Sequence, residues 1–359
     1  MEEVITYEQK QQISIDKKPQ RYSGLDFFKF ICAFLVVCIH IRIPHVGYWV
    51  VAIARVAVPF FFMVTGFFFP MNFNKEKQKR QLKKVLILTL FANVLYIVVK
   101  IIIEAISGGL GLFLAETFTL DNLIKFLVFN DPFAGAHNWY LNALLYALVL
   151  LFVITKFVNI KKIYFLIPVL LVANMALQVL GEVFPDTILG SNLLIRNFLF
   201  MGLPFILLGN YLRAKQFNIK KLPLIIGVFA FLILTVLEKM FFNRVFNFHD
   251  FELWFSSIFF AISLFLFALK IDNNNKVYLF VSKCGRDYSS IIYVIHTLII
   301  FGIAAVLEII NVDIINKTYE YAGTFIVFFA SLVVAYLYVL IIKAIKTKKE
   351  LKKNDTPKG

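Results

Sequence analysis

An apolar run near the start of the chain, GLDFFKFICAFLVVCIH, contains three side chains that could do chemistry: Asp26, Lys29 and His40. On a helix, Asp26 and Lys29 stand at i and i+3 and can pair on one face. Lys29 and His40 also share a helix face and lie roughly 16 Å apart along the axis, at about 1.5 Å per residue. A cation and a more distant imidazole, the usual general base near neutral pH, could hold a long ligand with an anionic head and a reactive tail.

Each of these side chains also has a purely structural interpretation. Asp26 and Lys29 could place their charged ends at the inner membrane interface while the apolar parts of their side chains stay in the membrane. His40 could simply hydrogen-bond to a neighbouring helix. Ionisable groups within a membrane span cost about 2.5–3.5 kcal/mol each on insertion scales, so each remains a candidate for a functional site.

Two further runs combine an arginine with a proline. ARVAVPFFFMVTGFFF holds Arg55, Pro59 and Gly66, and RNFLFMGLPFILLG holds Arg196 and Pro204. Proline bends a membrane helix and frees backbone carbonyls that could line a cavity, and glycine lets helices approach closely. Arg55 is either a cation facing such a cavity or a residue near the outer interface.

Aromatic residues and histidines open two other runs. HNWYLNALLY contains His137, Trp139 and Tyr140, where an aromatic belt at the membrane interface is expected. His137 could contact an acceptor from the outer side. DYSSIIYVIH places Tyr293 and His296 at i and i+3, either lining a cavity or, for His296, as a packed and satisfied histidine.

The composition of the chain indicates the class of protein that must position these residues. The chain has 359 residues, of which 60% are hydrophobic and 16% charged, with a mean hydropathy of +0.80. Soluble domains are about 45–50% apolar and about 25% charged, so an ordinary soluble enzyme is excluded. The cysteines at 32, 38 and 284 have no metal-binding spacing, and no Walker, HExxH or GxSxG motif is present.

About ten apolar runs approach the roughly 20 residues that a helix needs to cross a bilayer. They cover 24–43, 48–70, 84–106, 138–155, 163–180, 196–212, 222–241, 252–270, 288–309 and 322–342. The sequence therefore predicts an all-α, polytopic membrane protein. The stretch 107–136 is only moderately apolar, and we expect an interfacial or re-entrant piece there, because a further crossing would break the charge pattern described next.

Most of the 37 Lys and Arg residues fall in alternate loops, which is the positive-inside pattern and predicts that both termini are cytoplasmic. We expect a cytoplasmic N-terminal segment 1–23, a transmembrane domain 24–342 and a basic, disordered cytoplasmic tail 343–359. The net charge of +15 then reflects topology and attraction to anionic lipid, not nucleic-acid binding. We expect a multi-pass protein of the cell membrane with no cleavable signal peptide and no second soluble domain.

In their order and spacing, these stretches resemble the acyltransferase-3 family of integral membrane acyltransferases, over roughly residues 20–345. Lys29 and His40 fall on that family's first-span motif of an arginine, ten residues and a histidine. ARVAVPFFFMVTGFFF and HNWYLNALLY resemble its second-span and His-x-Trp-Tyr-Leu segments, and the two later stretches match as well. Lys29 replaces the motif's arginine and Thr65 a commoner serine; lysine keeps the charge but loses the two-pronged guanidinium geometry.

The resemblance implies transfer of an acyl group, usually acetyl, from cytoplasmic acyl-CoA to a hydroxyl of a cell-envelope glycan or a lipid-linked sugar. His40 would be the general base or a transient acyl carrier. Lys29 and Arg55 would hold the donor or stabilise the oxyanion, with Asp26 orienting Lys29. Acyl-CoA would be a substrate, with no bound cofactor and no metal.

On the acceptor side, His137, Trp139 and Tyr140 would shape the site, since aromatic rings can stack on sugar faces. Tyr293 and His296 are candidates for lining the cavity. A separate extracytoplasmic protein could complete the reaction.

Two other classes of protein remain open. A transporter or flippase of an envelope precursor would use many spans, bent helices and buried charges equally well. The sequence shows no inverted repeat, which disfavours this alternative. A structural or regulatory membrane subunit would instead tolerate substitution of Lys29 and His40.

Overall fold

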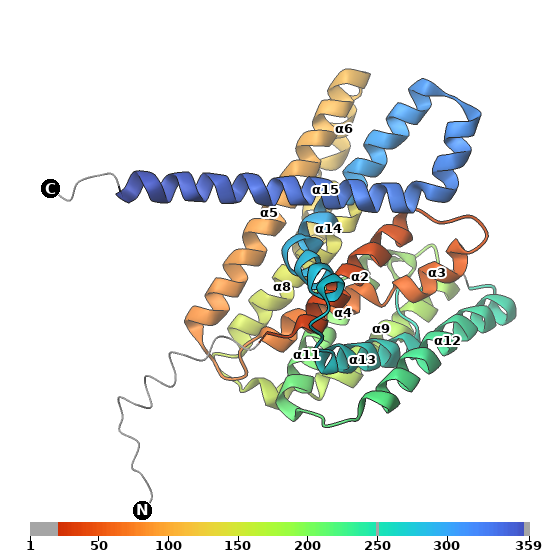
Figure 1. The fold of residues 1–359 in the computed structure, drawn as a ribbon. Coiled ribbons are helices and arrows are strands. Elements are labelled where there is room, and N and C mark those ends of the chain that lie inside the picture. Colours follow the sequence, from red (N-terminus) through yellow and green to blue (C-terminus); the bar gives the residue numbers. More distant parts are fainter. Residues whose placement is uncertain (1–20, 249–250, 355–359) are drawn as a thin grey trace, which may run out of the picture.

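Helices make up all the regular structure in the computed structural model of the protein, which describes residues 21–248 and 251–354 (Figure 1). Nine helical stretches in these ranges are long and apolar enough to cross a membrane, and α13 (Phe255–Lys270) is a shorter apolar helix of 16 residues. The predicted all-α, polytopic membrane fold is therefore confirmed. Most of the expected N-terminal segment, residues 1–20, lies outside the described ranges.

The spanning helices follow the predicted runs. They are α2 (Ser23–His40), α3 with α4 (Gly47–Ala54 and Ala57–Phe68), α5 (Lys75–Ser107), η1 with α8 (Ala136–Asn138 and Trp139–Ile154), η2 with α9 (Ile160–Ile163 and Leu166–Val183), α10, η4 and α11 (Asn192–Ile195, Phe198–Gly202 and Leu203–Lys215), α12 (Lys221–Phe246), α14 (Lys276–Ile310) and α15 (Asp313–Asn354).

The main departure from the prediction lies at the C-terminal end. Helix α15 continues to Asn354, so most of the segment expected to be a disordered tail, 343–359, is helical. This segment is rich in lysine, which is a good helix former, and contains no proline before position 357.

Helix α2 lies at the centre of the fold, against α3, α4, α13, α14 and α15. Its buried face carries small side chains, among them Cys32, Ala33 and Cys38, so the two free cysteines act as small hydrophobes here. Close to the N-terminal end of α2, Gly285 of α14 lies directly against the Asp26 backbone, where any Cβ would collide with the carbonyl oxygen. The helix that carries His40 is thus held by backbone-to-backbone packing.

Prolines interrupt two of the spans, as predicted, and each interruption lies beside an arginine. α3 and α4 separate at Arg55, four residues before Pro59, whose ring clashes with the carbonyl at that distance. Pro204 stands in the first turn of α11, after the π-helical turn η4 and close to Arg196. The two breaks therefore bring two cations into the interior.

Glycines also set the crossing of α4 and α11. A Cβ on Gly66 would strike the backbone of Ile206, and a Cβ on Gly209 would strike the backbone of Met63. The two helices therefore touch along their backbones, as expected for Gly66.

The stretch 107–136 does not form another crossing. It contains α6 (Leu110–Thr117) and α7 (Leu120–Phe129), which have 8 and 10 residues, whereas a crossing needs roughly 20. The Tyr146 hydroxyl of α8 donates to the Phe126 carbonyl at 2.9 Å and so ties α7 to the bundle.

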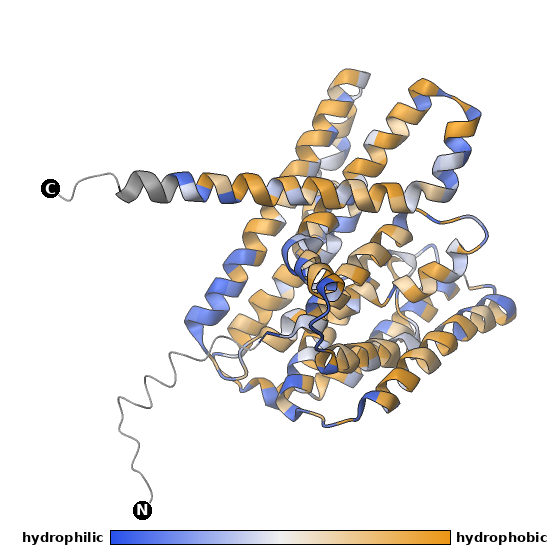
Figure 2. Cartoon of the chain, viewed as in Figure 1, coloured by the Kyte–Doolittle hydropathy of each residue, from blue (hydrophilic) through white to orange (hydrophobic). Residues whose placement is uncertain are grey.

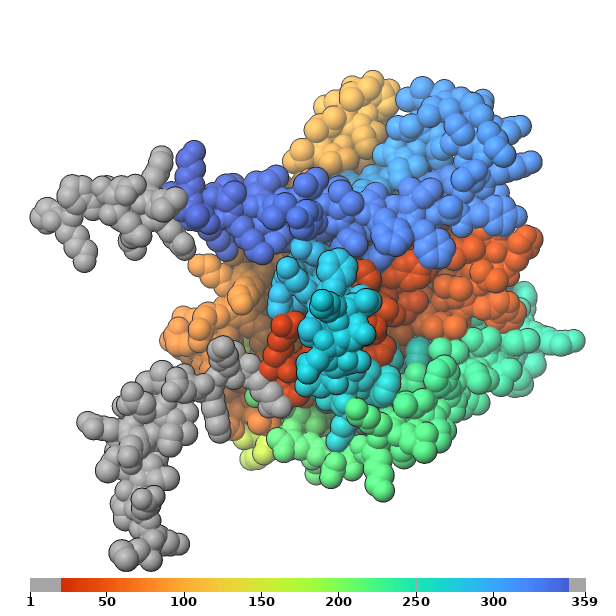
Figure 3. Space-filling model, in the orientation of Figure 1, coloured from red at the N-terminus to blue at the C-terminus, as the bar shows by residue number. Residues whose placement is uncertain are grey.

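Hydrophobic residues make up most of the long helices, and hydrophilic residues gather mainly at helix ends and in loops (Figure 2). Ile106 of α5 and Ile309 of α14 are 83% and 84% exposed, as suits helices facing lipid tails. Helix α15 contacts α14 and α2 and lies across the face of the molecule that is turned to the viewer in Figure 3.

The packing of α14 on α2 gives a first prediction. Gly285→Ala should lower the free energy of unfolding by about 1–3 kcal/mol, because the added methyl must push two backbones apart. Gly302→Ala in the same helix is the matched control, since no atom lies within 4 Å of its Cβ position. Thermal unfolding in detergent, followed by size-exclusion chromatography, measures both variants. Equal unfolding temperatures for the two variants would contradict the close packing.

Candidate active site

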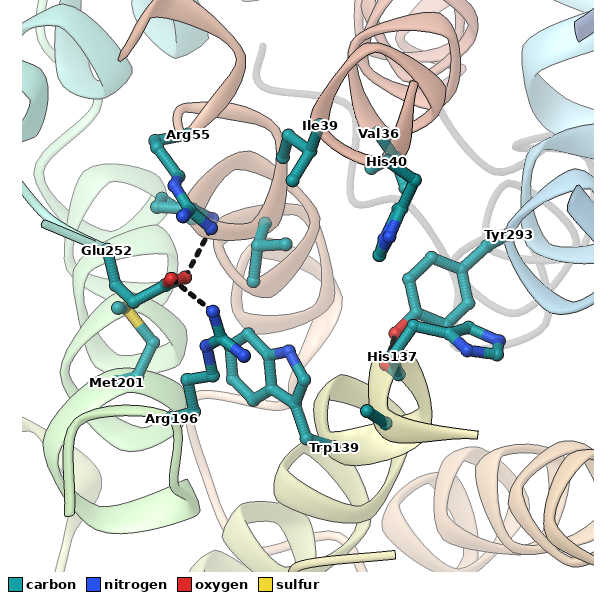
Figure 4. Close-up of a pocket in the computed structure, with 13 residues that line it drawn as sticks. Val36, Ile39, His40, Arg55, His137, Trp139, Arg196, Met201, Glu252 and Tyr293 are labelled. Atoms are coloured by element: carbon teal, nitrogen blue, oxygen red, sulfur yellow. Dashed lines mark hydrogen bonds and ion pairs between the residues drawn. The ribbon is translucent and has the colours of Figure 1, made fainter. Parts of the chain in front are cut away.

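A cavity of about 90 Å³ lies where α2 ends and the two interrupted spans meet; it is lined by His40, Arg55, His137, Trp139 and Tyr293, among others. We call it the histidine cavity. His40 is the last residue of α2, and His137 lies in the turn η1 that precedes α8. Figure 4 shows His40, His137 and Tyr293 on one side and a group of charged residues on the other.

That charged group consists of two arginines that share one carboxylate. Arg55 donates to Glu252 Oε2 at 2.6 Å, and Arg196 donates to Glu252 Oε1 at 2.5 Å (Figure 4). The Glu252 side chain is only 6% exposed. Charges this deep require close partners, since desolvation is expensive. The bridge joins the break before α4, the segment before η4 and the loop before α13.

The loop that carries Glu252 is fixed by an amide from α9. Gln178 Oε1 accepts from the backbone N–H of Glu252 at 2.6 Å and of Leu253 at 3.1 Å. Gln178 Nε2 donates in turn to the Leu253 carbonyl at 3.1 Å. The carboxylate is therefore presented by a buried and hydrogen-bonded backbone.

Three histidines gather on the opposite side. The ring centroids of His40 and His296 lie 5.0 Å apart, those of His137 and His296 5.3 Å, and those of His40 and His137 6.3 Å. His40 is accessible from the cavity, whereas His137 is 6% and His296 0% exposed. His40 is thus the histidine that a substrate can reach.

The loop around His137 is clamped to α5 and α14. The Tyr293 hydroxyl donates to the His137 backbone carbonyl, and the Thr297 hydroxyl lies 3.3 Å from His137 Nδ1. Gly135 has a φ of +69° and packs against the Tyr96 ring, which a Cβ would strike. A side chain at Gly135 would therefore displace the turn that carries His137.

A second cavity, of about 270 Å³, lies on the other side of Tyr293 and is lined by Lys29, Lys84, Thr65, Tyr140 and Ser289, among others. We call it the lysine cavity. Tyr293 lines both cavities and so forms a common wall. Tyr140 stacks edge-on against it at a centroid distance of 5.0 Å.

The predicted pair at the start of α2 is present. Lys29 Nζ lies 2.9 Å from Asp26 Oδ1, at the expected i, i+3 spacing. Asp26 also lies 3.7 Å from the Arg21 guanidinium. The carboxylate thus holds the Lys29 ammonium in the lysine cavity.

The residues singled out in the sequence are divided between the two cavities. Those that line the histidine cavity are His40, Arg55, His137, Trp139 and Tyr293. Lys29 and Tyr140 line the lysine cavity. Tyr140 therefore lines a different cavity from its neighbour Trp139, with which it was expected to shape the acceptor site. His296 lines neither cavity and instead lies behind His40, in contrast to the expectation that it would face the cavity.

Sequence reasoning missed Glu252 and gave no role to Arg196 or Lys84. The signal available for Glu252 was an acidic residue at the first position of an apolar run. Its partners are 197 and 56 positions away, so only the folded chain identifies the bridge.

Among the side chains of residues 21–248 and 251–348, no group of three His, Cys, Asp or Glu residues is arranged to hold a metal ion. What the two cavities do offer is an accessible imidazole beside fixed cations, with a lysine-lined space next to it. An imidazole can take a proton from a hydroxyl, and cations can bind phosphate or a developing oxyanion.

The fold and the site define a multi-pass membrane protein with an accessible histidine in one cavity, next to a second cavity that shares Tyr293 with it. The family described as "Acyltransferase domain", Acyl_transf_3, matches residues 22–343, nearly the whole chain. The chain belongs to this acyltransferase-3 family, and the resemblance found in the sequence is confirmed.

Two proteins from Enterococcus faecalis, each named amino-acid racemase, are similar to parts of the chain. One is 30% identical over 168 residues, which cover 44% of this chain and 22% of that protein. The other is 25% identical over 305 residues, which cover 78% and 41% respectively. The chain thus spans less than half the length of either relative. No solved structure matches it.

The shared carboxylate gives a second prediction. Glu252→Ala should lower the free energy of unfolding by about 3–5 kcal/mol, because it removes the buried carboxylate that serves as counter-charge to two partly buried guanidinium groups. Glu104→Ala is the control, since that carboxylate pairs with Lys100 at the surface of α5 and should matter little. Thermal unfolding followed by tryptophan fluorescence compares them. A Glu252 variant as stable as the control would contradict the structural importance of the bridge.

Proposed function

We propose that the protein transfers an acyl group, acetyl in the first instance, from acyl-CoA to a hydroxyl of a cell-envelope glycan or a lipid-linked sugar. The observation that supports this most is the placement of His40 and Tyr293. His40 opens into one cavity, and Tyr293 separates that cavity from one lined by Lys29 and Lys84. The acceptor would reach the imidazole directly, and the donor would approach it past Tyr293.

The lysine cavity suits the donor. Lys29 and Lys84 offer two cations for the phosphates of acyl-CoA, and the positive-inside pattern predicts that this end of α2 and α5 faces the cytoplasm. Lysine binds phosphate as a point charge without a fixed fork. Lys29 thus serves the role that the family's arginine implies, with Asp26 holding its ammonium in place.

The histidine cavity suits the acceptor. Trp139 offers a ring face on which a sugar can stack, and His137 lies next to it. Arg55 and Arg196 keep a carboxylate between them, so the arginines form a fixed positive edge in the cavity. Arg55 is in this way placed to stabilise negative charge that develops near His40, and donor phosphates belong with Lys29.

In the proposed reaction, His40 carries a proton from the acceptor hydroxyl to the CoA leaving group. The imidazole takes the proton of the acceptor hydroxyl as its oxygen attacks the thioester carbonyl, and an oxyanion forms. The carbon–sulfur bond then breaks, an ester forms, and the proton passes from His40 to the CoA thiolate. In the two-step version the imidazole itself carries the acyl group before the hydroxyl attacks, with the same overall products.

The same proposal includes the membrane in which the protein acts and the molecules with which it interacts. The protein would act in the cell membrane, surrounded by the lipid bilayer, in the modification of an envelope polysaccharide or its lipid-linked precursor. It would need no bound cofactor, and a separate extracytoplasmic protein could act on the product.

Replacing the central histidine tests the proposed function. Purified wild-type protein in nanodiscs, given radiolabelled acetyl-CoA, should release CoA as water takes the place of the acceptor hydroxyl, and His40→Ala should reduce the rate by about 100-fold or more, the usual contribution of a general base. His45→Ala, outside both cavities, is the control and should keep wild-type activity.

Label on the wild-type protein alone would favour the two-step version. Full CoA release by a well-folded His40→Ala protein would overturn the role of His40. If wild-type protein consumes none of a panel of acyl-CoA donors but moves an envelope precursor across the bilayer, a transporter would be the better description.

A further inference from the structure

His296 is a buried histidine with one ring nitrogen held against backbone carbonyls. It lies on α14, is 0% exposed and lines neither cavity. Its Nδ1 lies 2.8 Å from the Tyr293 carbonyl oxygen and 3.2 Å from that of Ile292. Carbonyl oxygens only accept, so Nδ1 must carry the hydrogen, and Nε2 of the neutral ring holds a free lone pair.

That lone pair is not satisfied. Among residues 21–248 and 251–348, no hydrogen-bond partner reaches His296 Nε2, although the atom is buried. Buried polar atoms without a partner are rare in folded proteins, and each calls for an explanation. The atom is an acceptor within the protein interior that awaits a donor.

The nearest imidazole is that of His40. The two ring centroids lie 5.0 Å apart, a spacing that a nitrogen-to-nitrogen hydrogen bond of about 2.9 Å can bridge once the ring edges face each other. His137 is the other neighbour, at 5.3 Å, but its ring already lies against the Thr297 hydroxyl. His40 stands at the end of its helix and opens into a cavity, so its ring has room to turn.

We propose that His296 is a positioning residue: its Nε2 accepts the N–H of His40 and thereby fixes the orientation and tautomer of the reactive imidazole. The other nitrogen of His40 is then unprotonated and faces the cavity. This inference rests on the proposed role of His40 as a base. This series of hydrogen bonds starts at the backbone carbonyls of Ile292 and Tyr293. They accept from His296 Nδ1 and so leave Nε2 as the acceptor.

The arrangement has a consequence for the chemistry. Without an acceptor behind it, the His40 ring populates two tautomers and several orientations. Only a fraction of these present a lone pair to the incoming hydroxyl. The chemical step then slows, whereas binding of the donor in the lysine cavity, on the other side of Tyr293, stays as it was.

Two substitutions separate positioning from packing. His296→Phe fills the same space without an acceptor, and His296→Gln returns an amide oxygen near the place of Nε2. We expect kcat for CoA release to fall roughly 10- to 100-fold in His296→Phe, the loss typical of residues that orient a functional histidine. KM for acetyl-CoA should stay within about twofold, and His296→Gln should recover most of the loss.

Nitrogen-15 NMR of histidine-labelled protein in nanodiscs gives a readout that needs no substrate. The His40 signals, assigned by their loss in His40→Gln, should show a single tautomer in wild-type and His296→Gln protein and a mixture in His296→Phe. A mixed tautomer in wild-type protein would overturn the proposal, and this result does not depend on any variant folding. Unchanged kcat and an unchanged His40 spectrum in folded His296→Phe would overturn it as well.

The same experiment distinguishes the two levels of the account. If the tautomer of His40 depends on His296 but no acyl-CoA is consumed, then the positioning stands and the proposed function fails. If acyl-CoA is consumed with His40 but without regard to residue 296, the proposed function stands and the positioning fails.

Discussion

Two arginines that share one carboxylate inside a membrane protein are the constraint around which the site is built. Arg55 and Arg196 each lie beside an interrupted helix, and Glu252 joins them from a loop that Gln178 holds by its backbone. Charged groups in such an environment are stable only with their partners close by, so the bridge fixes how three distant segments meet. The cavity at His40 exists because these segments end there instead of running straight through.

The division of the polar interior into two spaces follows from the same geometry. Tyr293 separates a cavity with His40 from one with Lys29, and its hydroxyl is used on the His137 backbone. Helices α2 and α14, which carry these residues, are held in register where Gly285 meets the backbone of α2. The proposed acyl transfer has to bring a charged donor and a polar acceptor together in an apolar setting, and two cavities with a common wall are suited to it.

The sequence predicted the local features well, because they depend on neighbours along the chain. Spacing alone gave the Asp26–Lys29 pair, and Pro59 gave the interrupted second span. Long-range contacts could not be predicted in the same way: nothing near Glu252 in the sequence indicates its arginines, and Tyr140 next to Trp139 lines a different cavity. The place of His296 behind His40 depends on how α14 packs on α2. The helical end of α15 was not predicted, because its many lysines indicate disorder by their charge, although lysine also has a high helix propensity.

The most direct test of the account is a structure of the protein bound to a non-hydrolysable acyl-CoA analogue in nanodiscs. The account predicts the CoA phosphates at Lys29 and Lys84 and the carbonyl of the analogue next to Tyr293, within reach of His40. Binding of the analogue at a surface remote from Tyr293, or its entry through the histidine cavity with its phosphates on Arg55 and Arg196, would contradict the assignment of donor and acceptor to the two cavities.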